Sequence, residues 1–341
     1  MKNLRDMTYE EMLAEVSALG EKPYRAKQLF AWVYKRGVDD IGAMTDVSLA
    51  LRERMRDIYG IRGIRLIDAK TAPDGTRKFL SELEDGNRIE SVLIPETARL
   101  TLCVSTQAGC ALGCRFCMTG AGGFMRNLRL SEMTGQVFAA GTPLAEGERI
   151  TNVVLMGMGE PLANYDNVIR FTGILTDGNG FGFSHNKVTV STAGLVPAIK
   201  RFGEESNCAL AVSLNATTDE VRDRIMPINK KYPIKGLIAA LRAYPHAGKK
   251  HVTIEYVVLR DVNDSAEDAR RLAFLLRSIP CKVNLIPFNE FQGAAFKSPD
   301  NQRVSAMSRI LQDAGYTVIV RSSKGLEIQA ACGQLRGWRE E

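Results

Sequence analysis

The chain has 341 residues, of which 45% are hydrophobic and 25% are charged. These proportions are typical of a globular protein and exclude a disordered tail protein, a collagen and a coiled-coil rod. The length fits two small domains, or one barrel with an appendage. The formal net charge of +6 permits an RNA or phosphate partner without requiring one. No run of about 18 apolar residues occurs and the N-terminus lacks an apolar signal core, so we expect a cytoplasmic protein with no membrane partner.

Residues 1–60 are predicted to form a unit of three helices. Thr8 and Glu11 have the spacing of a capping box at the start of the first helix. Pro23 is placed to begin the second helix, and Ser48 is placed to cap the third. Arginines cluster in the third helix, and this cluster is either a solvated face or an RNA-contacting face.

Residues 61–95 have the composition of strands. Two turn signals divide them, Pro-Asp-Gly at 73–75 and Asp-Gly-Asn at 85–87. Asp-Gly between β-rich runs is a strong hairpin signal. We therefore predict a three-stranded meander that links the helical unit to the rest of the chain. Its strands are expected at Ile61–Ala69, Thr76–Leu83 and Arg88–Ile94.

From residue 96 onward, short apolar strands alternate with helices. This pattern predicts an α/β fold in which helices cover a parallel sheet. Six such units are too few for a closed eight-unit barrel, so an open partial barrel or a doubly wound sheet fits, and a further helix and strand end the chain. The strands are expected at Thr101–Thr106, Asn152–Met156, Lys187–Ser191, Ala209–Leu214, Val252–Leu259, Lys282–Ile286 and about 317–321. The helices are expected at about 131–140, 164–176, 195–203, 234–244, 265–278 and 301–315.

Three of the seven cysteines, Cys110, Cys114 and Cys117, have the spacing C-x3-C-x2-C. In a reducing compartment seven cysteines do not form a disulfide framework, and thiolates this close need a metal or cluster to hold them. A structural zinc site takes four protein ligands, but the motif contains neither a histidine nor a fourth cysteine. A cubane iron–sulfur cluster bound by three thiolates leaves one iron free to chelate a small molecule. The spacing favours such a cluster over zinc or a coincidence of structural cysteines.

The segment around this motif is rich in glycine, which allows the backbone to fold closely round a cluster. It contains arginines but no acidic residue between Thr97 and Ser131. Positive surroundings would stabilise thiolates and attract anions, unless these arginines are only solvated loop residues. They are Arg99, Arg115, Arg126 and Arg129.

The cysteine motif follows the first strand of the parallel set and resembles the signature of the radical S-adenosylmethionine (SAM) superfamily. Wider matches, from Tyr24 to Leu335, resemble the RlmN/Cfr family of RNA adenine methyltransferases, in particular its C2-methylating branch. Most of them follow predicted strands, at the edge where barrels build active sites. The matching segments are Cys103–Gly120, Met156–Leu162, Ser191–Thr192, Ser213–Asn215, Ile286–Asn289 and Ala330–Leu335.

The resemblance implies a partial (β/α)6 radical SAM barrel over 96–341 with a C-terminal extension, a β-meander over 61–95, and an N-terminal helical domain over 1–60 that contacts RNA. It implies one [4Fe-4S] cluster held by the three motif cysteines, and SAM used twice per turnover. Many members have histidine where this chain has Asn215, so only a backbone contact would survive there. Serines at strand ends also occur as plain helix caps. The SAM contacts carried over are Gly159, Glu160, Ser191, Ser213, Leu214, Asn215 and Asn289.

The family reaction implies roles for three more residues. Adenine C2 is electron-poor and does not attack an electrophilic methyl group, so a radical route is needed. In the family, the residue matching Cys332 is methylated by SAM, and its carbon then adds to C2 as a radical. Glu90, positioned by the meander edge, would remove the C2 proton, and Cys103 would attack Cys332 to release the product with a disulfide. Taken alone, Cys103 resembles a buried small residue and Glu90 a solvent-facing one.

The implied substrate is an adenosine in the peptidyl-transferase region of 23S rRNA. In some members the adenosine 3′ of the tRNA anticodon is a second substrate. An external, flavodoxin-like electron donor and a monomeric enzyme are expected. The basic pairs Lys230-Lys231 and Lys249-Lys250 are candidate phosphate contacts, although basic surface residues are common.

Two alternatives stay open. A Cfr-like enzyme would methylate adenine C8 with the same cluster and thiols, although Pro161 and Ile286–Asn289 look more like the C2 branch. A non-catalytic, zinc-stabilised RNA-binding protein is an alternative of another class. It would explain neither the residues at the strand ends nor the paired thiols.

Overall fold

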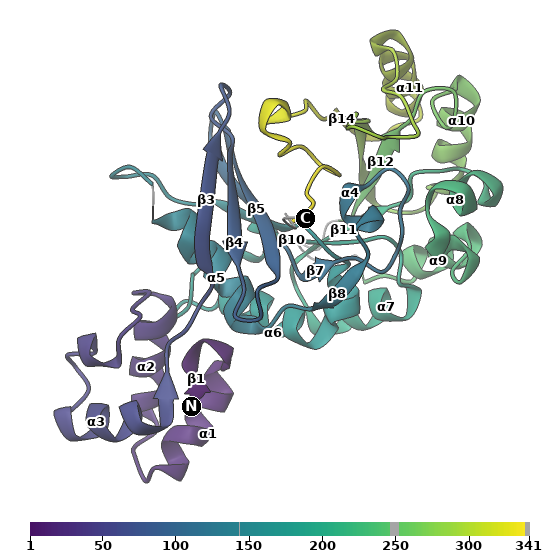
Figure 1. Ribbon diagram of the computed structural model, residues 1–341. Helices are drawn as coiled ribbons and strands as arrows, with labels where there is room; N and C mark the ends of the chain where they lie inside the picture. The colour runs from purple at the N-terminus through teal and green to yellow at the C-terminus, as the bar shows by residue number, and fades with distance from the viewer. Residues whose placement is uncertain (143, 246–251, 338–341) are drawn as a thin grey trace.

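The computed structural model describes residues 1–142, 144–245 and 252–337 (Figure 1). None of the helices in these ranges combines the length and apolar character that a membrane span needs. Lys249 and Lys250 lie outside the described residues. The helices are α1 Tyr9–Ala18, α2 Tyr24–Tyr34, α3 Leu49–Ile58, α4 Met118–Ala121, α5 Leu130–Gly141, α6 Tyr165–Thr176, α7 Val196–Glu205, α8 Asp219–Ile225, α9 Ile234–Arg242, α10 Ala266–Leu275 and α11 Asn301–Asp313. The strands are β1 Lys2–Asn3, β2 Tyr59–Gly60, β3 Arg65–Thr71, β4 Arg77–Glu82, β5 Arg88–Glu96, β6 Arg99–Cys103, β7 Gln107–Gly109, β8 Phe124–Asn127, β9 Asn152–Leu155, β10 Val188–Thr192, β11 Ala209–Ser213, β12 Val252–Val258, β13 Cys281–Pro287 and β14 Thr317–Val320.

Ten of these strands form one sheet, in the order β14-β13-β12-β11-β10-β9-β6-β5-β4-β3. Neighbouring strands are parallel from β14 to β6 and antiparallel from β6 to β3. The predicted three-stranded meander is therefore present, but it is not a separate linker because β5 pairs with β6 and extends the main sheet. Glu90 lies on β5, the outer strand of the meander, where the meander joins the parallel sheet.

The alternation of strands and helices predicted for the second half of the chain is confirmed. Each predicted element is present with ends that differ by a few residues, and the short helices α4 and α8 are additional. Seven parallel strands result, six from the predicted units and one from the further helix–strand pair. Within the described residues the sheet keeps two edges, β3 and β14, so it is an open sheet.

The N-terminal helices are present as predicted, with one exception in their capping. The Thr8 side chain accepts a hydrogen bond from the Glu11 N–H, and the Glu11 carboxylate accepts one from the Thr8 N–H, which confirms the capping box. Ser48 occupies the N-cap position of α3, but its side chain makes no capping hydrogen bond, so that predicted cap is wrong. A short parallel pair of strands, β1 and β2, joins the start of the chain to the end of α3.

The two faces of the parallel sheet differ in chemical character. On β12, Ile254 and Tyr256 are fully buried in the main hydrophobic core. Alternate residues of a strand point to the opposite face. There, the paired residues Ser213, Glu255 and Asn284 form a polar row across β11, β12 and β13. We call the face that carries this row the inner face, and Figure 1 shows the C-terminal segment (yellow) between the meander and β14.

Candidate active site

The cysteine loop begins on a short hairpin formed by β7 and β8. The Cys110 N–H donates to the Gly123 carbonyl at 2.8 Å. Gly109 has a φ of +77°, and a Cβ atom there would lie 2.0 Å from the Gly123 oxygen. Glycine tolerates both the positive φ and the close backbone approach. The hairpin therefore fixes the position at which the loop starts.

The three motif thiols lie close together and are half-buried. Desolvation raises the pKa of Cys110 to about 11. Burial, followed by the charges of Cys117 and Cys110, raises the pKa of Cys114 well above its usual range. Ionised thiolates here would repel one another, so a bound cationic group would stabilise them.

The donor set of these thiols fits a cluster, because the motif provides three cysteines and no fourth ligand. In the described ranges, no three His, Cys, Asp or Glu side chains converge closely enough to hold one metal ion. A zinc ion needs all of its sulfur ligands at about 2.3 Å from one centre. A cubane cluster instead places each thiolate on a different iron, so its ligands are spread further apart.

The arginines near the motif do not surround it with free positive charge. Arg126 pairs with Asp85 at 2.5 Å and with Glu132 at 2.8 Å. Arg99 and Arg129 also form ion pairs with carboxylates. Three of the four arginines are thus neutralised by acidic residues from outside the segment. The expectation that they supply positive surroundings is wrong for these three.

Gly159 and Glu160 follow β9 in a bend that requires glycine. Gly159 has a φ of +102°, and a Cβ atom there would lie 2.5 Å from the Cβ of Gln107. The buried Glu160 carboxylate accepts hydrogen bonds from the N–H groups of Ala193 at 2.7 Å and Leu162 at 3.0 Å. Desolvation raises the pKa of Glu160 to about 7. A cationic ammonium group bound beside this carboxyl would favour its ionised form.

The other residues predicted at the strand ends fall into two groups. The Ser191 and Ser213 side chains are half-buried, and neither hydroxyl has a hydrogen-bond partner in the part of the chain that the structure describes. Leu214 and Asn215 use their polar groups within the protein. The Asn215 Oδ1 accepts the Val257 N–H at 2.8 Å, and the Asn215 carbonyl accepts another side-chain N–H at 2.7 Å. The geometry therefore leaves the two serine hydroxyls available and engages the polar groups of Asn215.

The C-terminal segment that carries Cys332 is fixed by the elements around the site. The Asn289 side chain, just after β13, donates to the Cys332 carbonyl at 3.1 Å. The Met118 N–H, at the start of α4, donates to the Gly333 carbonyl at 2.8 Å. Because Met118 directly follows Cys117, the Cys332 segment is tied to the cysteine loop. Asn289, expected as a cofactor contact, connects the end of β13 to the same segment.

Cys103 and Cys332 are both free thiols. Cys103 ends β6 and is buried, whereas Cys332 is exposed. Desolvation raises the pKa of each to about 12, and a charge on Cys332 raises that of Cys103 further. The Cys332 pKa is raised in turn by the charge of Cys117. The fold thus brings both predicted reactive thiols near each other, and Cys332 near a motif cysteine.

Glu90 is buried, with 2% of its surface exposed, so its interpretation as a solvent-facing residue is wrong. Its Oε1 pairs with the Lys78 ammonium at 3.0 Å. Its Oε2 accepts the N–H of Arg336 at 2.7 Å and that of Gly337 at 3.3 Å. The carboxylate therefore has a fixed orientation, and it anchors the C-terminal segment a few residues after Cys332.

Strand register places Glu90 and Cys103 on the same side of the sheet. Val92 pairs with Cys103 across β5 and β6, and Glu90 lies two residues before Val92. Side chains of paired residues, and of residues two apart, share a face. Cys103 also pairs with Val154, and the register continues across β10 and β11 to the face that carries Ser213. Both predicted catalytic residues therefore point to the inner face.

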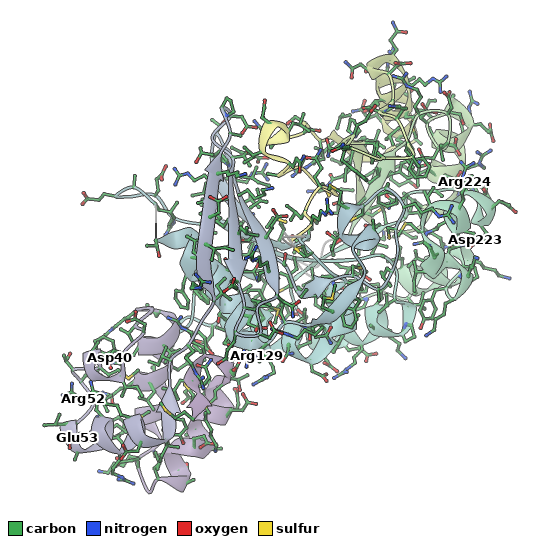
Figure 2. The ribbon with its side chains drawn as sticks, viewed as in Figure 1. Asp40, Arg52, Glu53, Arg129, Asp223 and Arg224 are labelled. Atoms are coloured by element: carbon green, nitrogen blue, oxygen red, sulfur yellow. The ribbon has the colours of Figure 1, made fainter. Side chains whose placement is uncertain are left out.

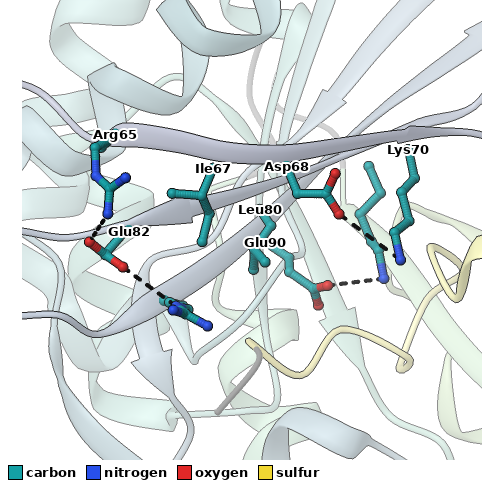
Figure 3. A pocket seen from close by; sticks show the side chains of 9 residues that line it. Arg65, Ile67, Asp68, Lys70, Leu80, Glu82 and Glu90 are labelled. Carbon is teal, nitrogen blue, oxygen red and sulfur yellow. Dashed lines mark hydrogen bonds and ion pairs between the residues drawn. The ribbon is translucent and has the colours of Figure 1, made fainter. Parts of the chain in front are cut away.

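A cavity of about 450 Å³ opens beside Glu90 on the meander (Figure 3). Glu82 forms ion pairs with Arg65 and with Arg88 in this cavity, the latter at 3.6 Å. The volume falls within the range of small-ligand sites. The cavity is lined by Arg65, Ile67, Asp68, Lys70, Lys78, Leu80, Glu82, Arg88 and Glu90. An open, charged hollow thus reaches the Glu90 carboxylate.

Two cations near the site, one half-buried and one fully buried, were not found from the sequence. Lys78 pairs with Glu90, and Arg222 on α8 is fully buried. Lys78 follows Arg77 in a strand, and Arg222 lies in a run of charged residues. Both patterns are typical of solvated faces, so no sequence signal distinguishes these two side chains.

Two family models match the chain in separate ranges. The model described as the N-terminal domain of ribosomal RNA large subunit methyltransferase matches residues 2–61, and the radical SAM superfamily matches residues 104–273. A protein of Desulfosudis oleivorans, called dual-specificity RNA methyltransferase RlmN, is 50% identical over 335 residues, covering 98% of this chain and 90% of that protein. The chain belongs to the RlmN family of radical SAM RNA methyltransferases. A Geobacter sulfurreducens relative of the same name is 48% identical over 337 residues, covering 99% of this chain and 92% of the relative.

A solved structure agrees with this RlmN-family assignment. The crystal structure of a radical SAM methyltransferase from Sphaerobacter thermophilus superposes with a TM-score of 0.92 at 42% identity. The match covers 98% of this chain and 99% of that one. Membership in the radical SAM superfamily implies a [4Fe-4S] cluster and SAM as cofactors. The donor set and spacing of the three motif thiols fit such a cluster.

Proposed function

We propose that this chain methylates C2 of an adenosine in the peptidyl-transferase region of 23S rRNA, and of the adenosine 3′ of the anticodon in some tRNAs. The observation that carries the proposal is the convergence of Cys103, Cys332 and Glu90 on one face of the sheet, beside the cysteine loop. An enzyme that transfers a methyl group directly from SAM to a nucleophile does not need two thiols and a carboxylate together. The printed names of the relatives, which describe dual-specificity RNA methyltransferases, support the choice of RNA.

The cofactor site in this proposal lies at the carboxyl ends of the parallel strands. Cys110, Cys114 and Cys117 hold the cluster, and Glu160 accepts hydrogen bonds from the SAM ammonium. When bound, the reduced cluster and SAM supply a radical that removes hydrogen from a methyl group. Two SAM molecules are used per turnover, and an external flavodoxin-like donor supplies electrons. The residues proposed to line the SAM site are Gly159, Glu160, Ser191, Ser213, Leu214, Asn215 and Asn289.

Each of the three convergent side chains has a separate role in the remaining steps of the reaction. Cys332 carries the carbon that becomes joined to adenine C2, so the RNA is held covalently for part of the cycle. Glu90 accepts the C2 proton, because Lys78 and two backbone N–H groups keep its carboxylate in one orientation. Cys103 then attacks the Cys332 sulfur, so that a disulfide forms as the sulfur–carbon bond breaks. The released carbon takes up a proton and becomes the methyl group of the freed RNA.

The cavity beside Glu90 is the proposed entrance for the adenosine. C2 is confined in a stacked helix, so the base must be unpaired or extruded before it reaches the carboxylate. Arg65 and Lys70 are exposed on the cavity wall and can contact the phosphates of the flanking strand. In this proposal residues 1–60 contact RNA, 61–95 form the meander, and 96–341 form the catalytic unit of a monomeric cytoplasmic enzyme.

The test is an anaerobic assay of the reconstituted protein with 23S rRNA and tRNA fragments, followed by nucleoside mass spectrometry. We expect 2-methyladenosine, and Glu90→Gln should lower its formation at least about 100-fold. Glu267→Gln is the control, because Glu267 is an exposed glutamate on α10 that does not line this cavity. Formation of 8-methyladenosine would instead identify a Cfr-like enzyme. Zinc without iron or sulfide in the protein would indicate a non-catalytic RNA-binding module.

A further inference from the structure

A fully buried arginine lies behind the strand ends of the candidate active site. Arg222 has 0% of its surface exposed. Its Nη2 donates to the carbonyls of Ala193 at 2.7 Å and Ser213 at 3.1 Å, and its Nε donates to the Leu214 carbonyl at 2.9 Å. Ala193 follows the end of β10, Ser213 is the last residue of β11, and Leu214 directly follows it. One guanidinium therefore holds the ends of two neighbouring parallel strands together.

The charge of this guanidinium has no direct acidic partner within the described residues. Its two further contacts are the Asn229 Oδ1 at 3.0 Å and the Tyr232 carbonyl at 3.5 Å, which are also neutral oxygens. Asp219 and Asp223 are near, but their carboxylates accept hydrogen bonds from the Asn229 amide. Desolvation lowers the pKa of Arg222 to about 10. A buried cation without an anionic partner is costly, so its charge calls for compensation from another source.

The helix that carries Arg222 packs directly against the cysteine loop. The Arg115 N–H, next to Cys114, donates to the Ile225 carbonyl at 3.0 Å. Cys114 itself packs against the small apolar cluster that contains Ile225. Arg222 lies three residues before Ile225, and residues at this spacing are neighbours on a helix surface. Arg222 therefore lies one helical turn from the residue through which α8 contacts the cysteine loop.

We infer that Arg222 is the internal counter-charge of the cofactor site, holding the ends of β10 and β11 and favouring the reduced state of the cluster. The inference rests on the proposed function, since it requires a cluster on the three motif cysteines. A cluster bound by three thiolates is anionic and becomes more so on reduction, so a poorly screened cation beside it raises the reduction potential. Arg222 is a positioning residue, because it acts on the cofactor site through the strand ends that it holds and through the electrostatic field of its charge.

The test separates the effect of the Arg222 charge from that of its planar shape. Redox titration of the anaerobically reconstituted protein reports the charge, and the SAM affinity of the same protein reports the shape. In Arg222→Gln, the ratio of reduced to oxidised cluster at a fixed solution potential should fall about tenfold, which corresponds to a shift of about 59 mV for one electron. SAM affinity should also fall several-fold. Arg222→Lys keeps the charge but not the planar fork, so it should keep the native midpoint and lose SAM affinity.

Arg224→Gln is the matched control, because Arg224 is exposed on the same helix (Figure 2) and its loss changes the net charge equally. It should leave both readouts unchanged, since solvent screens its charge. A native midpoint in a fully loaded Arg222→Gln protein would overturn the electrostatic role, and native SAM affinity in Arg222→Lys would overturn the positioning role.

A second variant tests the inference if Arg222→Gln does not fold. If Arg222→Gln is insoluble, Asp223→Asn removes a half-buried negative charge beside the guanidinium and should shift the midpoint to a more positive value. An unchanged midpoint there would contradict the inference. Absence of any cluster in the native protein would refute the proposed function itself, which separates the two failures.

Discussion

Ionisable side chains inside the site are poorly solvated. Desolvation is the main cause that raises the pKa of Glu160 and Glu255 to about 7 and that of Cys103 and Cys332 to about 12. The neutral forms of these groups are therefore favoured near neutral pH when no ligand is bound. A sulfonium cation bound nearby would favour the Cys332 thiolate, which is the form that accepts a methyl group.

Replacement of Cys103 separates adduct formation from product release. In Cys103→Ala, Cys332 can still join the RNA, but no second thiol can attack its sulfur. We expect crosslinked RNA to accumulate and turnover to fall at least about 100-fold, as measured on denaturing gels and by nucleoside analysis. Cys332→Ala should give neither adduct nor product. Cys208→Ala, a buried cysteine elsewhere in the core, should behave like the native protein, and normal turnover in Cys103→Ala would refute the assigned role.

Glu255 gives the protein a predictable pH dependence of stability. Its pKa is raised from 4.5 to about 7, so the folded protein holds this proton more tightly than the unfolded chain does. Stability should fall as pH rises from about 4.5 to about 7, by an amount on the order of 2–3 kcal/mol, and should then stay level with respect to this group. Glu255→Gln can still accept the Asn284 hydrogen bond. It should therefore be more stable than the native protein at pH 8 and similar at pH 5 in urea titrations; equal stability at pH 8 would contradict this.

At the scale of elements, turn residues and alternation predict most of the fold. The Asp-Gly turn and the alternating pattern after it correctly place Glu90 and Ile89 on opposite faces of β5. The pattern does not show that the face of Glu90 is covered. The N–H groups that cover it belong to Arg336 and Gly337, which lie 246 and 247 residues further along the chain. The hairpin of β7 and β8 was also not predicted, since strands of three and four residues carry too little pattern.

Gly109→Ala tests whether this hairpin is needed to build the cysteine loop. The positive φ and the 2.0 Å approach to the Gly123 oxygen leave no room for a methyl group. We expect the variant to lose most of its iron and sulfide after reconstitution, while circular dichroism shows that the sheet is retained. Gly122→Ala is the control, because φ is −75° there and the nearest atom is 3.6 Å from the added Cβ. Full cluster content in Gly109→Ala would show that the hairpin is dispensable.

For the whole molecule, polar contacts join the N-terminal helical unit to the catalytic unit, beside apolar and aromatic ones such as that of Tyr34 with Phe181. The Arg170 guanidinium on α6 donates to the Asp6 carbonyl and to the Glu11 carboxylate, both at 2.5 Å. The Asp6 carboxylate accepts the Ser131 N–H at 2.8 Å. The sequence predicts each unit separately from its own periodicity. It does not predict this docking, because single charged residues on helices look like ordinary solvated positions.

Arg170→Ala should loosen this docking without unfolding either unit. Loss of two hydrogen bonds to an arginine is worth about 2–4 kcal/mol when they are partly shielded from solvent. We expect faster hydrogen exchange in α1 and α6, which Arg170 joins, and unchanged exchange in β11 and β12. Arg201→Ala is the control, since that exposed arginine contacts nearby Asp166, Glu205 and the Tyr165 ring and forms no ion pair or hydrogen bond with the N-terminal unit among the described residues. Equal exchange in native protein and Arg170→Ala would mean that the apolar contacts alone hold the units together.

In the proposed reaction, a methyl group on Cys332 is the source of the carbon joined to the RNA. The most direct measurement supplies SAM with a deuterated methyl group, a reductant and an rRNA fragment, and analyses the 5′-deoxyadenosine formed. One deuterium per 5′-deoxyadenosine is expected in the native protein, because the radical takes hydrogen from the transferred methyl. Cys332→Ala should give unlabelled 5′-deoxyadenosine or none. Methylated RNA formed without deuterium in the native 5′-deoxyadenosine would contradict the account.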